Sequence, residues 1–162
     1  MRRIAAGLIL AAVTVAALSG CIFVRPNMTS PSTVPTNGSL QVCDGVDFTV
    51  TGTGFYTLRG DCGVVTVTGN DITIKAEDAE AIVIKGDRVN IEMGSLGRLD
   101  LEGNDNELDA DDIGGVNIAG DRNTVDADTS VAVTIQGNDN LVDSDVTGEV
   151  VQSGDRNLVG SR

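Results

Sequence analysis

Apolar residues recur at intervals of 17 positions along most of the chain, in three columns. The first column holds Leu40, Thr57, Ile74, Ile91, Leu108, Val125, Val142 and Val159. The second holds Phe48, Val65, Ile82, Leu99, Val116, Val133 and Val150, and the third holds Val50, Val67, Ile84, Leu101, Ile118, Ile135 and Gln152. Apolar and polar residues alternate around these positions, which is typical of strands with one buried face. The three columns are therefore the predicted core.

Glycines follow the same interval, at Gly52, Gly69, Gly86, Gly103, Gly120, Gly137 and Gly154. A second set, Gly63, Gly97, Gly114 and Gly148, marks another corner of the repeat. A short fixed period indicates a solenoid, in which each repeat is one coil stacked on the next. No proline follows Pro35, as ladder-paired strands require. We predict an all-β fold, a parallel β-helix or flattened β-solenoid of about seven 17-residue coils.

Two polar columns accompany the first glycine column. One alternates in charge and contains Asp71, Arg88, Asp105, Arg122, Asp139 and Arg156. The other contains Asn106, Asn123, Asn140 and Asn157, whose amides can hydrogen-bond along the stack as an internal ladder. A binding strip is the alternative interpretation of the charged column. We favour structural ladders, because the alternation keeps like charges from lying one coil apart.

The first 20 residues have the pattern of an export signal. Two arginines precede an apolar stretch, residues 4–18, that is too short to span a bilayer comfortably. This stretch ends in Leu-Ser-Gly-Cys at Cys21, which resembles the lipobox of bacterial lipoproteins. The resemblance implies that the Cys21 thiol receives diacylglycerol and that cleavage makes Cys21 the new N-terminus. The alternative is an ordinary secretory signal followed by a chance cysteine.

The chain thus divides into a lipoprotein signal peptide (1–20), a lipidated cysteine with a tether rich in Pro, Ser and Thr (21–37), and a β-solenoid domain (38–162). The lipobox, the tether and coils that read Gly-Asp-x-Asn together resemble small actinobacterial, mycobacterial-type lipoproteins with an uncharacterised β-helix domain. That resemblance implies an exported protein, lipid-anchored to the cell membrane with its domain on the extracytoplasmic side. It implies no activity.

Two further cysteines, Cys43 and Cys62, fall on neighbouring coils, two columns apart. An exported protein meets an oxidising compartment, where paired thiols form disulfides. We predict a disulfide that staples the first coils. A metal or redox pair is the alternative, and it is disfavoured because two thiols without histidine make a poor metal site.

Six aspartates form the candidate metal site. Asp109, Asp126 and Asp143 share one register, and Asp111, Asp128 and Asp145 share a second register two positions further on. Stacked carboxylates one coil apart repel each other, and hard Ca²⁺ ions, which accept carboxylate oxygens, would relieve that repulsion. Ca²⁺ binding is therefore the alternative to a solvated acidic face, and we expect no other cofactor.

The composition excludes several classes of function. With 24 acidic and 11 basic residues, the formal net charge is −13, which disfavours binding to nucleic acid and electrostatic binding to anionic lipid. The chain has no histidine, so histidine-based catalysis and histidine metal sites are excluded. A constant period also leaves no long loops of the kind that build enzyme clefts. We expect no enzymatic activity.

The C-terminal end is the predicted interaction surface. Its last coil carries no polar cap, and an open coil offers unpaired N–H and C=O groups to another strand. Leu141 and Leu158 lie in a column expected to face outward, where they would form a small apolar patch. We expect this edge to pair with a second copy or another envelope protein. The predicted function is a membrane-anchored envelope lipoprotein that serves as a structural or interaction scaffold; a Ca²⁺- or glycan-binding module is the alternative.

Overall fold

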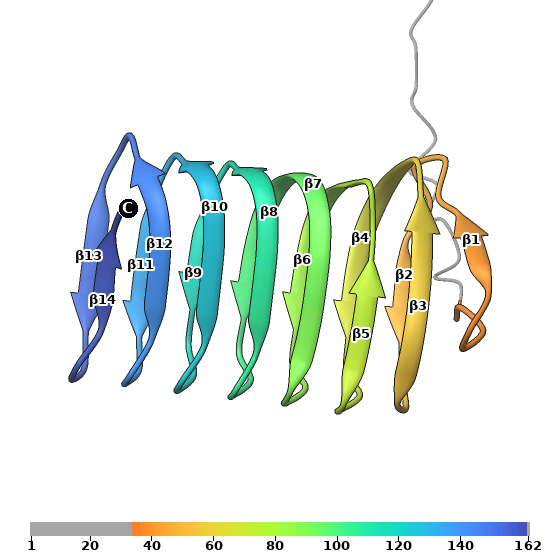
Figure 1. The fold of residues 1–162 in the computed structure, drawn as a ribbon, viewed down its shortest axis with the longest axis horizontal. Coiled ribbons are helices and arrows are strands. Elements are labelled where there is room, and N and C mark those ends of the chain that lie inside the picture. Colours follow the sequence, from red (N-terminus) through yellow and green to blue (C-terminus); the bar gives the residue numbers. More distant parts are fainter. Residues whose placement is uncertain (1–33, 162) are drawn as a thin grey trace, which may run out of the picture.

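A computed structural model describes residues 34–161, which form a β-solenoid with the first coils at one end and the last coils at the other (Figure 1). The strands are β1 (Leu40–Val42), β2 (Phe48–Val50), β3 (Gly54–Arg59), β4 (Asp61–Val67), β5 (Ile72–Lys75), β6 (Asp78–Ile84), β7 (Val89–Leu101), β8 (Glu107–Ile113), β9 (Val116–Ile118), β10 (Thr124–Ser130), β11 (Val133–Gln136), β12 (Leu141–Val146), β13 (Val150–Ser153) and β14 (Leu158–Gly160). The predicted signal peptide, Cys21 and most of the predicted tether lie outside these residues. Residues 34–161 contain no helix that is long and apolar enough to cross a membrane.

The strands pair in parallel along two faces of the solenoid. The first sheet runs β1-β3-β5-β7-β8-β10-β12-β14, and the second runs β2-β4-β6-β7-β9-β11-β13. The long strand β7 belongs to both sheets, because its first half pairs with β5 and β8 and its second half with β6 and β9. Paired residues are mostly 17 apart, as in Ile91 with Leu108 and Val125 with Val142. The predicted parallel β-solenoid is confirmed.

The core fills the space between the two sheets. The three apolar columns are buried as predicted along most of the stack. The first column is buried at Ile74, Ile91, Leu108, Val125 and Val142. The second is buried at Phe48, Val65, Ile82, Leu99, Val116 and Val133, and the third at Val50, Val67, Ile84, Leu101, Ile118 and Ile135. Each column stacks like on like, because parallel in-register pairing sets equivalent side chains one above another. A single continuous apolar core results.

In the first coils the predicted core is wrong for the first column only, because Phe48, Val50, Val65 and Val67 of the other two columns are buried. Leu40 is 52% exposed and Thr57 pairs with Lys75 in the outward row, whereas Tyr56 and Leu58 are buried. The cause is a register slip: Val50 and Val67 pair at a separation of 17, but Tyr56 pairs with Ile74 at 18. A slip of one residue sends alternate side chains to the opposite face.

The slip affects β3 and also β1, because Leu40 pairs with Thr57 at a separation of 17. It starts at the corner around Gly52, which is one residue shorter than the equivalent corner of the next coil. It ends before Asp61, which again pairs with Asp78 at a separation of 17. The extra residue is taken up near Gly60, whose φ is +83° and whose N–H donates to Glu77 Oε2 at 2.7 Å. The glycine spacing does not reveal the slip, because the residue missing at the Gly52 corner is balanced by the extra residue near Gly60.

The last coil also departs from the predicted core. Val150 is 41% exposed and Gln152 is exposed, although both fall in core columns. Within residues 34–161, no further coil stacks on them. Burial in a solenoid depends on having a neighbour on both sides.

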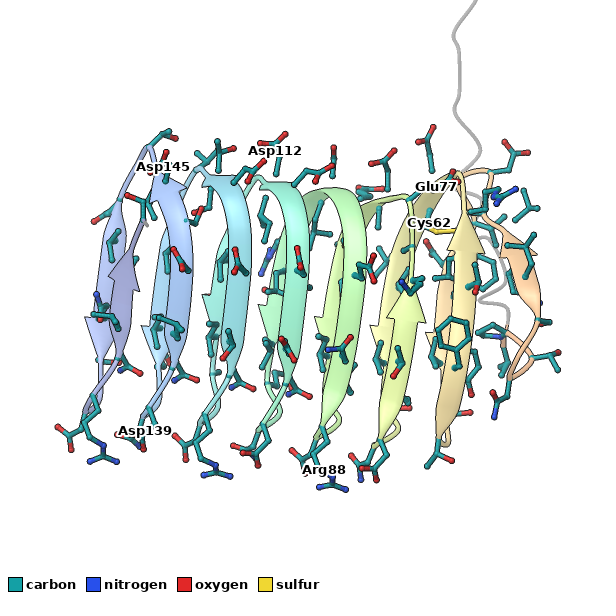
Figure 2. The ribbon with its side chains drawn as sticks, viewed as in Figure 1. Cys62, Glu77, Arg88, Asp112, Asp139 and Asp145 are labelled. Atoms are coloured by element: carbon teal, nitrogen blue, oxygen red, sulfur yellow. A yellow bond between two sulfur atoms is a disulfide. The ribbon has the colours of Figure 1, made fainter. Side chains whose placement is uncertain are left out.

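The disulfide predicted for the first coils is confirmed. Cys43 and Cys62 are bonded, with their Cα atoms 4.6 Å apart, and both side chains lie in the core. Cys62 lies at the corner reached when the chain leaves the first sheet (Figure 2). The bond joins the first coil covalently to the second.

Candidate functional site

One corner of the solenoid carries a repeated polar turn, which we call the polar corner. It joins each strand of the second sheet to the next strand of the first sheet, and its triplets begin at Gly69, Gly86, Gly103, Gly120, Gly137 and Gly154. The glycine is required by close approach: a Cβ on Gly103 would lie 1.9 Å from the carbonyl oxygen of Gly86. The third residue of every triplet is left-handed, with φ between 55° and 57°, at Asp71, Arg88, Asp105, Arg122, Asp139 and Arg156.

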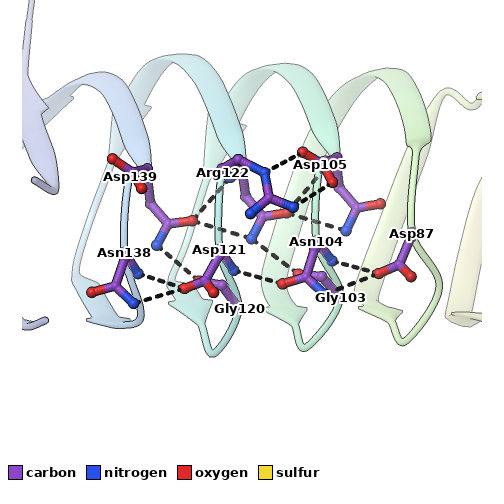
Figure 3. A network of polar contacts seen from close by, with 12 residues as sticks. Asp87, Gly103, Asn104, Asp105, Gly120, Asp121, Arg122, Asn138 and Asp139 are labelled. Carbon is purple, nitrogen blue, oxygen red and sulfur yellow. Dashed lines mark hydrogen bonds and ion pairs between the residues drawn. The ribbon is translucent and has the colours of Figure 1, made fainter. Parts of the chain in front are cut away.

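The second residues of these triplets form one hydrogen-bonded ladder, alternating Asn and Asp. Asp87 Oδ1 accepts the backbone N–H of Asn104 at 2.8 Å and its side-chain amide at 3.2 Å. Asn104 Oδ1 in turn accepts the backbone N–H of Asp121 at 2.9 Å, and Asp121 Oδ1 accepts from Asn138 (Figure 3). Because an amide separates successive carboxylates, Asp87 and Asp121 each receive donors, and no carboxylate of the ladder faces another one coil away.

The third residues form the alternating line of charge. Arg88 donates two hydrogen bonds to Asp71 at 2.7 and 2.8 Å, and Arg122 donates two to Asp105, both at 2.7 Å. Arg156 binds Asp139 in the same way. The guanidinium hydrogen bonds lower the pKa of the Asp71, Asp105 and Asp139 carboxyls; desolvation opposes this shift, and the positive charge of the arginine adds to it. All these groups are exposed, so solvent screens the pairs.

Immediately inside the polar corner lies the asparagine ladder, formed by Asn106, Asn123, Asn140 and Asn157. Asn123 Oδ1 accepts from the backbone and side-chain nitrogens of Asn106 at 3.0 and 3.2 Å, and Asn123 donates to Asn140 Oδ1 at 3.1 Å and to the Gly103 carbonyl at 3.0 Å. The first three asparagines are 0–2% exposed. The ladder therefore satisfies buried backbone groups that a tight corner would otherwise leave unpaired.

The ladders bind coil to coil, and this limits what the polar corner can do chemically. Asp71, Asp87, Asp105, Asp121 and Asp139 receive their donors from a neighbouring coil, and each guanidinium of the Asp–Arg line is used in a bidentate pair. The arrangement is therefore one that stabilises the stack. It matches the structural interpretation of both polar columns rather than the binding strip.

The aspartates of the candidate metal site follow the predicted register only in part. Asp109, Asp126 and Asp143 pair in sequence on the outward face of the first sheet. Asp145, however, pairs with Thr129 and not with Asp128, because the register of β10 and β12 shifts by one residue after Asp126. The second predicted column, Asp111, Asp128 and Asp145, is thus broken.

Four of these six aspartates, Asp126, Asp128, Asp143 and Asp145, line one shallow hollow of about 240 Å³. Among residues 34–161 there is no cluster of three or more acidic or cysteine side chains that could hold a metal ion. Beside them, the Thr129 hydroxyl donates a hydrogen bond to Oδ1 of Asp112 at 2.5 Å. The carboxylates that line the hollow are therefore neighbours on the surface without forming such a cluster.

The hollows of the surface are shallow. One of about 300 Å³ lies on the outward face of the second sheet, where Arg98 binds Asp100 at 2.6 Å and Asn117 donates to Asp100 at 3.2 Å. Another, of about 420 Å³, lies at the C-terminal end of the solenoid and is lined by Val146, Val150 and Val159 among others. The second hollow exposes the end of the core.

The sequence pattern did not indicate the structural role of one asparagine, Asn37. Asn37 lies next to Gly54, accepts the Phe55 N–H at 3.1 Å through Oδ1 and donates to the Thr53 carbonyl at 3.2 Å. Asn37 therefore satisfies two backbone groups of the following coil. The register slip shifts Asn37 out of the glycine frame, so the 17-residue count gave no signal for it.

Comparison with known proteins adds a partial match. Residues 101–157 match a family described as "Protein of unknown function (DUF3060)". The chain matches none of the curated proteins and none of the solved structures significantly. The matched segment contains all four members of the asparagine ladder and the Arg122 and Arg156 pairs. The similarity covers the most regular coils and brings no activity with it.

Proposed function

We propose that this chain is an exported lipoprotein whose β-solenoid serves as a rigid, non-catalytic scaffold on the extracytoplasmic side of the cell membrane. The observation that carries the proposal is the buried disulfide between Cys43 and Cys62. Structural disulfides form and persist in oxidising compartments outside the cytoplasm. An export signal followed by a lipobox at Cys21 is the sequence pattern that would deliver the solenoid to such a compartment and hold it there.

The scaffold part of the proposal is supported by how the polar residues are used. In the polar corner, the carboxylates and guanidinium groups bind neighbouring coils rather than converge on a cleft. A stack held by a continuous core and by three parallel ladders resists bending and local opening. Such a body suits the task of holding an interaction surface at a fixed distance from a lipid anchor.

The test of anchoring is detergent-phase partitioning of the full chain expressed in a bacterium with lipoprotein processing. The wild type should enter the detergent phase, and Cys21→Ala should remain unprocessed or enter the aqueous phase. The matched control replaces Cys43 and Cys62 by alanine, which removes two thiols but leaves Cys21, and should partition like the wild type. Equal behaviour of Cys21→Ala and wild type, with the same N-terminal sequence, would contradict lipidation.

The test of compartment uses a single surface thiol on intact cells. Lys85→Cys places an exposed cysteine on the outward side of the second sheet, where it is reached by a maleimide that does not cross membranes. We expect labelling of this variant without cell lysis. We expect no labelling of wild type, because Cys43 and Cys62 are bonded to each other and the Cys21 thiol carries the proposed lipid. Labelling of Lys85→Cys only after lysis would place the solenoid inside the cell.

A further inference from the structure

Four apolar side chains are exposed on the first coils of the solenoid. Leu40 and Val42 of β1 are 52% and 69% exposed, and Phe55 of β3 is 42% exposed. Because β1 pairs in parallel with β3, and Phe55 precedes the buried Tyr56, all three lie on the outward face of the first sheet. Val34, which is 65% exposed, lies six residues before Leu40 (40 − 34 = 6). We call Val34, Leu40, Val42 and Phe55 the apolar patch.

The outward face of the first sheet changes in character along the stack. One of its columns consists of successive partners Leu40, Thr57, Lys75, Glu92, Asp109, Asp126 and Asp143. An apolar residue is followed by a hydroxyl, a cation and then four carboxylates. The cation, Lys75, lies 2.5 Å from the first of these carboxylates, Glu92. The face is therefore apolar at β1 and β3, basic at the next coil and acidic beyond it.

The coils that carry the apolar patch have few charges of their own. Neither residues 34–43 nor residues 48–58 contain Asp, Glu, Lys or Arg, so the turns that lead into β1 and β3 are uncharged. The carboxylates of these coils lie at the corner with the disulfide, which follows the ends of β1 and β3: Asp44, Asp47 and Asp61. Arg59 lies at the end of β3 and forms an ion pair with Glu77 at 3.3 Å. The start of β3 is therefore the neutral side of this end.

A lipid surface is the partner that this distribution fits. Exposed apolar patches mark interaction sites, and apolar side chains enter the boundary between lipid headgroups and acyl chains. Cations beside such a contact are attracted by anionic headgroups, which repel carboxylates. The formal net charge of −13 disfavours electrostatic binding of the whole chain to anionic lipid. A contact must therefore use the uncharged coils and keep the acidic coils away.

The proposed lipid anchor would bring this end of the solenoid to the membrane. Val34 follows Cys21 by 13 positions (34 − 21 = 13). Thirteen residues reach at most about 45 Å when fully extended. Strand β1 comes next, and each later coil lies roughly 4.8 Å farther along the stack. An anchored contact needs little affinity of its own, because the tether keeps the patch at a high effective concentration near lipid.

We propose that the apolar patch is a membrane-contact surface. It lies in the headgroup region, with Arg59 and Lys75 beside it, and the solenoid axis is tilted so that the acidic coils from β8 onward stay clear of the bilayer. The inference rests on the proposed function, because the anchor at Cys21 brings the patch to lipid. It adds an orientation: the first coils touch the membrane, and the later coils are presented away from it.

Single tryptophans can report this contact, because the chain contains none. The full chain is made by cell-free synthesis under oxidising conditions, so that Cys43 and Cys62 are bonded and Cys21 keeps a free thiol. Cys21 is then coupled to vesicles of phosphatidylcholine and phosphatidylglycerol that contain a maleimide lipid. The anchor is thus supplied chemically. A failure of lipidation in cells would appear in the detergent-phase test above and would not affect this result.

Phe55→Trp places the reporter in the apolar patch, and Thr124→Trp is the matched control. The two positions share one outward column and are four coils apart. Lipids with brominated acyl chains should quench Phe55→Trp about fivefold more strongly, because Thr124 lies roughly 19 Å farther along the stack. Leu40→Trp is a second reporter in the patch and should behave like Phe55→Trp. Equal quenching of the patch reporters and the control would overturn the proposal.

A carboxylate introduced into the patch should remove the contact. Leu40→Asp should abolish the excess quenching of the Phe55→Trp reporter, and Thr124→Asp, also on the outward face, should leave it unchanged. Circular dichroism checks that both variants are folded. Unchanged quenching in a folded Leu40→Asp variant would contradict the contact. A blue shift of the Phe55→Trp emission that needs no vesicles and grows with protein concentration would assign the patch to a second copy, and would also overturn the proposal.

Discussion

The first coils, residues 34–67, and the later coils, residues 69–157, build the same solenoid by different means. The first coils rely on a disulfide, on the buried aromatic rings of Phe48 and Tyr56 and on a strand whose register slips. The later coils keep one register at the polar corner and close it with three stacked polar ladders. The difference shows that a coil with a neighbour on both sides can be closed by repetition, whereas a coil at the N-terminal end is closed by particular bonds.

The largest expected difference in stability between the two regions comes from glycine substitutions. Gly103→Ala in the later coils should destabilise the fold by about 4 kcal/mol, because its Cβ would overlap the Gly86 carbonyl oxygen at 1.9 Å. Gly52→Ala in the first coils should cost less, since nothing lies within 4 Å and the penalty is only that of its positive φ of +93°. Chemical denaturation measures both. Gly115→Ala, with open space and no positive φ, is the control and should be near wild type.

Removal of the disulfide should have the next largest effect on the free energy of unfolding. Cys43→Ala with Cys62→Ala opens a loop of 19 residues and should lower the free energy of unfolding by about 3 kcal/mol. Because the bond belongs to the first coils only, protease sensitivity should rise before residue 67 and stay unchanged in residues 101–157. Uniform sensitivity along the whole chain would show that the two regions unfold as one unit.

The asparagine ladder should contribute less per residue, and most in its middle. Asn123→Ala leaves the buried N–H of Asn106 without its acceptor and should cost about 2 kcal/mol. Asn157→Ala removes the last and less buried member and should cost clearly less. Thermal denaturation of the two variants gives the comparison. Equal losses would mean that position in the stack does not matter.

The smallest effect belongs to the exposed Asp–Arg line, and it should appear as a dependence on pH. The pKa of Asp71, Asp105 and Asp139 is lower in the folded chain than in the unfolded chain, because each accepts hydrogen bonds from an arginine. Their contribution is therefore complete above the unfolded pKa of about 4 and is lost as the pH falls through the lower folded pKa. The melting temperature should fall below about pH 4. The triple variant with asparagine at these positions should lose less on acidification than wild type.

The sequence predicted the period, the parallel coils, the disulfide and the core of the middle coils, because in-register stacking repeats one residue type along each column. It did not predict that Tyr56 and Leu58 replace Leu40 and Thr57, since a short corner and a later insertion cancel in the count. Nor did it predict that Asp145 pairs with Thr129, which follows from a one-residue shift inside β12. Spacing along a chain gives the average register, and local corner geometry sets the exceptions.

Hydrogen exchange at single-residue resolution tests most directly whether stacked side chains close the later coils. The backbone N–H groups of Asn106, Asn123 and Asn140 each donate to an asparagine Oδ1 one coil on, and not to another backbone group. We predict that these three amides exchange as slowly as the neighbouring strand amides of β8, β10 and β12. Exchange at the rate of an unfolded peptide would show that the ladders do not form, and the contrast between the two regions would fail.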